Sequence, residues 1–186
     1  PPGQRFDGIR VVPPPGAFLQ ATAHGQAVLT AAMIEAVGGA GHVADLFAGC
    51  GTFALPLARG AEVHAVEGEA AMLRALDEGW RKAEGLKKVT TEARDLFRNP
   101  LLPQELERYD ALVLDPPRAG AEAQVRQIAE SKVPVLGFVS CNPVTFARDA
   151  AVLRAGGYLL DWVQVVDQFR WSSHIELAAR FSRAHI

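Results

Sequence analysis

Short apolar runs alternate with segments of helical periodicity along most of the chain. Five such runs predict buried strands, at 42–47, 62–66, 88–91, 109–114 and 135–140. Between them, apolar side chains recur every three or four residues, as Met72, Leu73 and Leu76 do, which predicts amphipathic helices. Strands and helices that alternate in this way are typical of a Rossmann-like α/β fold, a mostly parallel sheet with helices on both faces.

The last two predicted strands, 158–166 and 174–181, are joined differently. Only residues 167–173 separate them, whereas a parallel crossover takes a dozen or more residues. We therefore expect the final strand to be antiparallel and to begin at the edge where the parallel strands end. Open α/β sheets bind their ligands at that edge.

Composition narrows the class of protein. With 186 residues, 49% of them hydrophobic, and a net charge of −2, the chain predicts one folded domain rather than a disordered or strongly basic one. We interpret the proline-rich residues 1–17, with one short strand at Ile9–Val12, as an N-terminal linker or the remnant of a preceding domain, and 18–186 as the domain. Two cysteines, no signal peptide and no long apolar run favour a cytoplasmic protein without a membrane span.

A glycine loop follows the first long strand, in the segment 45–52, and leads into a helix. Gly49 and Gly51 allow a tight turn and a close approach of the backbone to a ligand, and the helix start adds free N–H donors. Glu67 ends the next strand, about 20 residues after these glycines. An acid at this position can bind the two hydroxyl groups of a ribose. Loops that bind dinucleotides usually have a third glycine at the position of Ala54. The segment that begins with Asp45 looks more like the corresponding loop of S-adenosylmethionine methyltransferases.

Cys141 follows the strand 135–140 and precedes Asn142, a good helix N-cap, with Pro143 at the first helical position. The field of that helix favours a thiolate, although a buried, inert cysteine fits the same pattern. Cys50 lies in the glycine loop. No metal-ligand spacing accompanies either cysteine, so we expect no metal.

Three more charged groups fall at the same predicted edge. Two prolines hold Asp115 there, and Arg118 could bind a phosphate or pair with Asp115. Alternation places His174 and Glu176 on one face of the last strand, where Glu176 could be a general base or a solvated carboxylate. Asp95, after the third strand, could reach an adenine amine or cap a helix.

Together these segments resemble the RNA uracil-5 methyltransferase family. The matching pieces occur in the family's order: Phe18-Leu19-Gln20, Asp45–Thr52, Glu67, Asp115–Arg118, Ser140–Pro143 and Val166–Phe169 with His174–Glu176. The resemblance implies a class I methyltransferase sheet and S-adenosylmethionine as cofactor. It also implies 5-methyluridine formation on a flipped or single-stranded uridine of transfer or ribosomal RNA.

The resemblance further assigns roles to residues. Cys141 would be the nucleophile that adds to the uracil, and Glu176 the base. The cofactor site would be lined by Gln20, Phe47, Gly49, Gly51, Thr52, Glu67, Asp95 and Asp115. Thr52 stands where relatives often carry Asn, and Arg170-Trp171 stands where they carry Pro-His. Relatives also carry a central domain, and often an RNA-binding barrel, so we expect a monomeric fragment that binds RNA poorly alone.

Three other functions compete with this interpretation. An amino-methyltransferase has an aromatic residue after its Pro-Pro turn, where this chain has Arg118, and it gives Cys141 no task. A dinucleotide oxidoreductase is disfavoured by the glycine loop. A non-catalytic module that binds S-adenosylmethionine or RNA would carry the same segments without needing the thiol.

Overall fold

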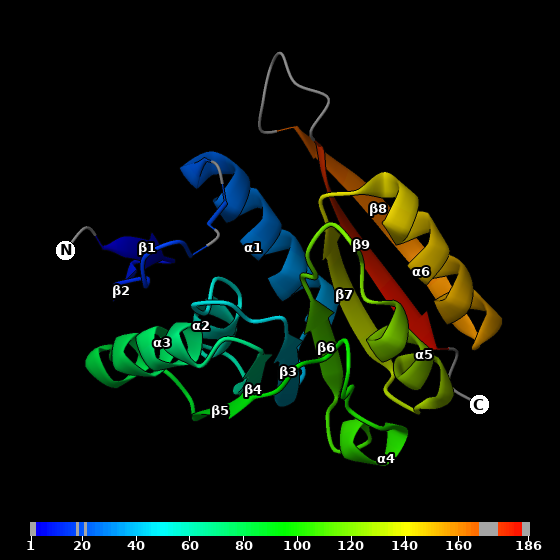
Figure 1. Ribbon diagram of the computed structural model, residues 1–186, viewed down its shortest axis with the longest axis horizontal. Helices are drawn as coiled ribbons and strands as arrows, with labels where there is room; N and C mark the ends of the chain where they lie inside the picture. Colours follow the sequence, from blue (N-terminus) through cyan, green and yellow to red (C-terminus); the bar gives the residue numbers. More distant parts are fainter. Residues whose placement is uncertain (1–2, 18, 21, 168–174, 184–186) are drawn as a thin grey trace.

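The computed structural model describes residues 3–17, 19–20, 22–167 and 175–183 (Figure 1). Its centre is a seven-stranded sheet in the order β5-β4-β3-β6-β7-β9-β8. The strands are β3 (His42–Leu46), β4 (Glu62–Glu67), β5 (Val89–Ala93), β6 (Ala111–Leu114), β7 (Val135–Ser140), β8 (Tyr158–Asp167) and β9 (Ile175–Arg183). Strands β3 to β7 pair in parallel, and β9 is antiparallel to both β7 and β8. The predicted fold class, including its antiparallel last strand, is confirmed.

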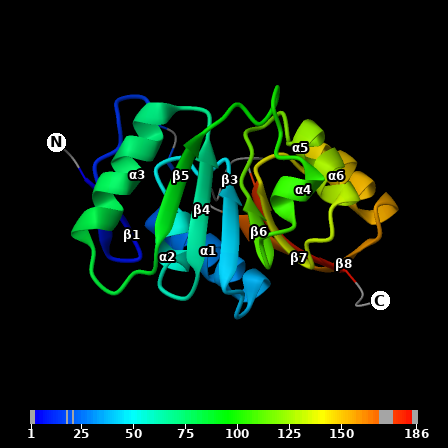
Figure 2. The same cartoon turned by 90° about the horizontal axis from the view of Figure 1, so that it is seen from below.

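Helices cover both faces of this sheet (Figure 2). One apolar core lies between the sheet and α1 (Ala23–Val37), α2 (Ala54–Leu57) and α3 (Ala70–Lys82), and we call this side the α1 face. A second core lies between the sheet and α4 (Pro103–Leu106), α5 (Glu122–Glu130) and α6 (Pro143–Ala155), on the α5 face. The central strands are buried on both sides, which explains their continuous apolar runs.

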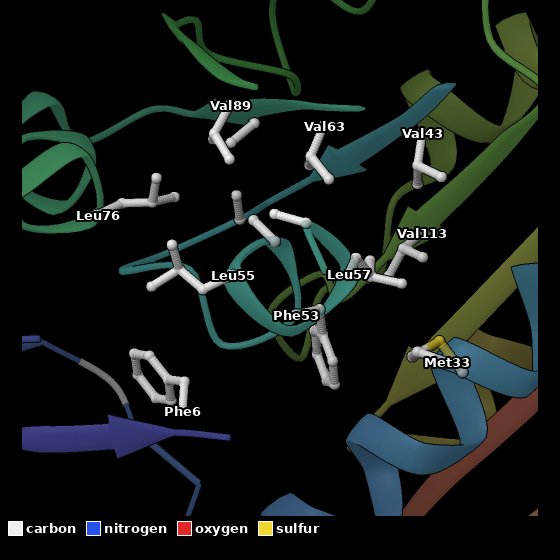
Figure 3. Packing of buried hydrophobic residues seen from close by; sticks show 14 of the residues in the cluster. Phe6, Met33, Val43, Phe53, Leu55, Leu57, Val63, Leu76, Val89 and Val113 are labelled. Atoms are coloured by element: carbon white, nitrogen blue, oxygen red, sulfur yellow. The ribbon is translucent and has the colours of Figure 1, made fainter. Parts of the chain in front are cut away.

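Near the N-terminus, β1 (Gln4–Phe6) and β2 (Ile9–Val11) form an antiparallel hairpin on the α1 face. Phe6, Ile9 and Val11 are buried in the core there, and Figure 3 shows the Phe6 ring turned towards the side chains of α2. The sequence pattern predicted only the second of these strands. The Asp-Gly pair of the turn, with positive φ at both residues, was the available hairpin signal. The division into residues 1–17 and 18–186 stays a prediction.

Two helices differ from the prediction. The helix expected directly after the glycine loop is short: α2 spans only Ala54–Leu57, because the chain first turns through Gly51 at a positive φ. The unpredicted α4 is a single turn, too short to show helical periodicity. It starts at Pro103, and Glu105 accepts a hydrogen bond from the backbone N–H of Leu102. Among the described residues, no helix is both long and apolar enough to cross a membrane.

Candidate active site

A cavity of about 790 Å³ opens at the carboxyl edge of the parallel strands. It is bordered by the ends of β3, β4, β6 and β7 and by the start of β9. Most of the residues that the sequence singled out line this one cavity, namely Gln20, Phe47, Gly49, Thr52, Glu67, Asp95, Asp115, Cys141 and Glu176. The fold therefore brings together side chains that are spread over more than 150 positions of the sequence.

Gly51 is the predicted site residue that does not line the cavity. A Cβ atom there would lie 2.8 Å from Cγ of Leu76 and 3.0 Å from Cγ of Leu55, so this glycine allows α2 and α3 to pack closely. At Gly49, in contrast, a Cβ atom would meet nothing within 4 Å. Gly49 thus presents its backbone to the cavity, whereas Gly51 serves the packing behind the loop.

Phe47 belongs to the same loop and has an unusual backbone conformation. It has a φ of 63°, a left-handed conformation that costs a non-glycine residue roughly 1–2 kcal/mol. Its ring lies against that of Phe97, with centroids 5.4 Å apart. Phe97 also lines the cavity and is 47% exposed. Sequence analysis missed Phe97, although an aromatic residue two positions after Asp95 was a usable signal.

Glu67 joins two loops at the mouth of the cavity. One carboxylate oxygen accepts a hydrogen bond from the backbone N–H of Gly49, and the other accepts one from Glu69, both at 3.0 Å. These bonds fix the glycine loop against the end of β4. They also hold the carboxylate at the cavity wall, where its remaining lone pairs are open to a ligand.

Asp95 both caps a turn and lines the cavity. Its Oδ1 accepts hydrogen bonds from the backbone N–H groups of Phe97 and Arg98, which caps the turn after β5. The same residue lines the cavity. The turn therefore fixes the direction of the carboxylate, and capping does not remove it from the site.

Arg94 supports that turn from behind, and sequence analysis gave no sign of it. Its guanidinium donates to both carboxylate oxygens of Glu105, to the backbone oxygens of Asn99 and Pro100, and to Glu92. Only 11% of its side chain is exposed. The segment from β5 to α4, which carries Asp95 and Phe97, is thus held around one buried cation.

Strand register places Cys141 opposite Glu176. Ser140 of β7 pairs with Leu177 of β9 in the antiparallel ladder, so the next pair of positions is Cys141 and Glu176. Residues opposite each other in such a ladder have Cβ atoms about 5 Å apart on the same face. The two groups that sequence proposed as nucleophile and base are therefore neighbours in the cavity.

The acid–base state of Cys141 differs from the expectation. Burial raises the pKa of this thiol, and the charges of Glu176 and Asp115 raise it further. A backbone hydrogen bond and Arg118 lower it only in part. The position of Cys141 before α6 therefore does not by itself lower the pKa of the thiol, because burial, and after it the adjacent carboxylates, act in the opposite direction. The role of Cys141 as the nucleophile stays a prediction.

Cys50 has a different environment. It is 2% exposed, and its Sγ lies 3.1 Å from the sulfur of Met72. Burial, with smaller contributions from Glu67 and Glu69, raises its pKa to about 11. Cys141 lines the cavity and Cys50 does not, so Cys141 is the better placed nucleophile of the two.

Two buried acids lie deeper at the same edge. Burial raises the pKa of Asp45 to about 8, and the backbone N–H of Ala54 offsets only part of this rise. The carboxylate oxygens of Asp45 make no hydrogen bond of normal geometry. Burial also raises the pKa of Asp115 well above its usual value, and the charges of Glu176 and Asp45 add to the effect.

Acidic groups outnumber basic ones along the cavity wall. Five carboxyl groups line it, against two arginines, and Arg94 is occupied by Glu92 and Glu105. Among the described residues, no three His, Cys, Asp or Glu side chains are grouped as metal ligands. The cavity therefore suits an organic cation of nucleoside size, with apolar contacts from rings such as Phe47. His174 and Phe18, which sequence also proposed, lie outside the described residues.

The sequence is similar to those of several known proteins. Residues 79–183 match the family model of tRNA (uracil-5-)-methyltransferases. The chain is 52% identical to an RNA methyltransferase of Rhizobium meliloti, over 98% of this chain and 44% of the relative. It is 42% identical to a 23S rRNA (uracil(1939)-C(5))-methyltransferase of Chromohalobacter salexigens, over 87% of this chain and 34% of that protein. It therefore spans less than half the length of these relatives.

Solved structures give the same result. The tRNA (uracil-54, C5)-methyltransferase of Pyrococcus abyssi, in complex with S-adenosyl-L-homocysteine, superposes with a TM-score of 0.82 at 27% identity. The match covers 96% of this chain and 43% of that one. The M. jannaschii protein TYW2, at 18% identity and a TM-score of 0.68, shares the fold. The chain thus has the class I methyltransferase fold, and it belongs to the tRNA (uracil-5-)-methyltransferase family.

Proposed function

We propose that this chain is the catalytic domain of an S-adenosylmethionine-dependent RNA methyltransferase that forms 5-methyluridine in transfer or ribosomal RNA. The observation that carries the proposal is that Cys141 and Glu176, one step beyond the last β7–β9 pair, lie close together in the cavity that Gly49 and Glu67 also line. The family match and the names of the relatives support it.

The residues of the cavity fit this cofactor. Glu67, fixed by the backbone of Gly49, would hold the ribose hydroxyls, and Asp95 would hold the adenine amine. Gln20, Phe47, Thr52 and Asp115 complete the wall. The excess of carboxylates suits a ligand that carries an ammonium and a sulfonium charge. When bound, S-adenosylmethionine supplies a methyl group that the sulfonium charge makes electrophilic.

The reaction itself needs a nucleophile and a base close to one ring. C5 of uracil is a weak nucleophile. Once the Cys141 thiol has lost its proton to solvent, addition of its sulfur to C6 turns the ring into an enolate with electron density at C5. After C5 has gained a methyl group, Glu176 removes the C5 proton. The electrons of that C–H bond restore the C5–C6 double bond and expel the Cys141 sulfur.

A base inside an RNA helix cannot reach this cavity, so the uridine must be flipped out or single-stranded. The chain has a net charge of −2, and a basic surface is what normally binds the phosphate backbone. We therefore propose that RNA affinity depends on parts of the protein beyond this chain. We also propose that the protein acts in the cytoplasm as a monomer.

The test is to change Cys141 and Glu176 separately in the gene and to measure 5-methyluridine in cellular RNA by mass mapping. Cys141→Ala removes the nucleophile and should abolish the modification. Glu176→Gln removes the base after the sulfur has added, so a covalent RNA–protein species should accumulate as a slow gel band. The matched control is Cys50→Ala, which leaves the cavity unchanged and should retain the modification.

Two outcomes would reject parts of this proposal. Full 5-methyluridine formation with Cys141→Ala would reject covalent catalysis by this chain and favour a non-catalytic binding module. The absence of any slow band with Glu176→Gln, while the modification is lost, would reject Glu176 as the base.

A further inference from the structure

Three acids and one thiol from different strands meet on one side of the sheet. Asp45 lies in β3, Asp115 follows β6, Cys141 follows β7 and Glu176 lies in β9. Their neighbours two positions away all pack in the core of the α1 face, namely Val43, Val113, Val139 and Ala178. Because side chains alternate along a strand, these four groups project to that same face. We call them the acid–thiol cluster.

The cluster is short of partners. Asp45 is 0% exposed, and its carboxylate oxygens make no hydrogen bond of normal geometry, nor does the buried Oε2 of Glu176. A buried carboxylate without partners is costly in its charged form and tolerable as the neutral acid. Burial accordingly raises the pKa of Glu176, and burial together with its acidic neighbours raises that of Asp115. In the ligand-free chain, Asp45, with a pKa of about 8, therefore keeps its proton near neutral pH, and Asp115 and Glu176 hold theirs to a higher pH than usual.

Among the described residues, the charged groups around the cluster do little to favour its ionised forms. From β4, Glu67 adds a further negative charge that raises the pKa of Asp45. Arg118, in the loop after β6, lowers the pKa of Cys141, but burial, Glu176 and Asp115 outweigh it. Arg94 is bound to Glu92 and Glu105.

We propose that the acid–thiol cluster couples cofactor binding to proton release, so that the cavity distinguishes the cationic cofactor from its uncharged product. This inference rests on the proposed function. S-adenosylmethionine and S-adenosylhomocysteine share their adenosine and amino acid parts and differ in one methyl group and the sulfonium charge. A sulfonium beside Asp115 and Glu176 favours their ionised forms, and the protons pass to solvent. The neutral thioether leaves those protons in place.

Because protons are released when the cofactor binds, the affinity for each ligand should depend on pH in a different way. Affinity for S-adenosylmethionine should rise with pH up to the raised pKa values of the free cluster, by as much as roughly tenfold per pH unit for one released proton. Affinity for S-adenosylhomocysteine should change much less, which promotes product exchange as pH rises. The same positive charge should make the Cys141 thiol easier to ionise, so the nucleophile is activated when the cofactor is present.

The test is calorimetric titration of the 186-residue chain with each ligand, in buffers of different ionisation enthalpy, across roughly pH 5.5 to 8.5. The dependence of heat on buffer gives the number of protons released. We expect about one proton for S-adenosylmethionine near pH 7 and clearly fewer for S-adenosylhomocysteine. Asp115→Asn and Glu176→Gln should each reduce the difference between the ligands, and Glu107→Gln, at an exposed acid outside the cavity, should leave it unchanged.

A second measurement does not depend on those variants. In a Cys50→Ala chain, the rate of Cys141 alkylation by iodoacetamide is followed against pH at equal occupancy by either ligand. The midpoint should lie at lower pH with S-adenosylmethionine than with S-adenosylhomocysteine. Equal proton release by both ligands, an unshifted midpoint, or an undiminished difference in both Asp115→Asn and Glu176→Gln would overturn the inference. Failure of both ligands to bind would instead reject the cofactor assignment in the proposed function.

Discussion

At the scale of single residues, burial sets the chemistry of the groups that the sequence marks. Asp45 opens the glycine loop as a conspicuous acid, yet its side chain is fully buried and its pKa is raised to about 8. Cys141 precedes a capped helix, yet burial, together with the neighbouring carboxylates, raises its pKa. In both cases the deciding neighbours come from other strands, so residue type and local sequence were not enough to predict the charge.

The raised pKa of Asp45 can be tested by measuring the free energy of unfolding at different pH values. Its usual pKa of 3.8 applies to the unfolded chain, and the folded value is about 8. Between these values the folded state holds a proton that the unfolded state has lost, so this group weakens the fold as pH rises, by up to about 1.4 kcal/mol per pH unit. Asp45→Asn removes this dependence. Urea denaturation should show the variant gaining stability relative to the parent chain between about pH 5 and pH 7.5. A difference that does not change with pH would contradict the raised pKa.

At the scale of elements, the connection from β5 to α4 is organised by one arginine. Arg94 binds Glu105 of α4 and the backbone between, and so fixes the turn that presents Asp95 and Phe97 to the cavity. The spacing of apolar residues cannot predict the conformation of such a segment, because hydrogen bonds to a charged side chain determine it. This is why α4 and Phe97 were missed while the long helices were predicted.

The Arg94–Glu105 pair predicts an acid-sensitive contribution to stability. Hydrogen bonds from Arg94 lower the pKa of Glu105 from 4.5 to about 2. The pair therefore stabilises the fold above pH 4.5, and this stabilisation is lost as pH falls towards 2. Glu105→Gln should cost about 1 kcal/mol or less at pH 7, because the carboxylate is partly exposed. Thermal unfolding should show the gap to the parent chain closing in acid, whereas the exposed neighbour variant Glu107→Gln should show no such trend. A gap that persists in acid would contradict the assignment.

At the scale of the whole molecule, α1 packs on the sheet, and the segment that precedes it lines the cavity. The segment with Leu19 and Gln20, which lines the cavity, leads directly into α1. Gly137 of β7 allows α1 to lie close, because a Cβ there would be 2.8 Å from Sδ of Met33. Met33 lies between α1 and the neighbouring strands (Figure 3).

Gly137→Ala should therefore destabilise the chain by about 1–3 kcal/mol, by forcing Met33 and α1 outward. Adding Met33→Ala should make room, so the double variant should be more stable than the sum of the two single effects predicts. Denaturant unfolding of the four chains measures this coupling. Gly60→Ala is the control, because a Cβ there meets only one backbone oxygen, at 4.0 Å. Strictly additive effects would show that Met33 is not the obstacle.

The sequence by itself determined the fold class and the candidate chemistry. Buried strands and amphipathic helices differ in the spacing of their apolar residues, and this spacing can be recognised in the sequence. The short connection between β8 and β9 requires an antiparallel pair, which brings Glu176 to the ligand edge. The motifs around Gly49, Asp115, Cys141 and Glu176 identified the residue types that a methyl transfer to uracil would need.

Only the tertiary structure decided how those residues act on one another. The β7–β9 register places Cys141 opposite Glu176, and the alternation of four strands gathers Asp45 and Asp115 on the same face. Gly51 turned inwards to the core, and Glu67 bound the glycine loop. These outcomes depend on pairing between distant segments and on the loss of water around buried acids, and neither quantity is encoded in any local stretch of sequence.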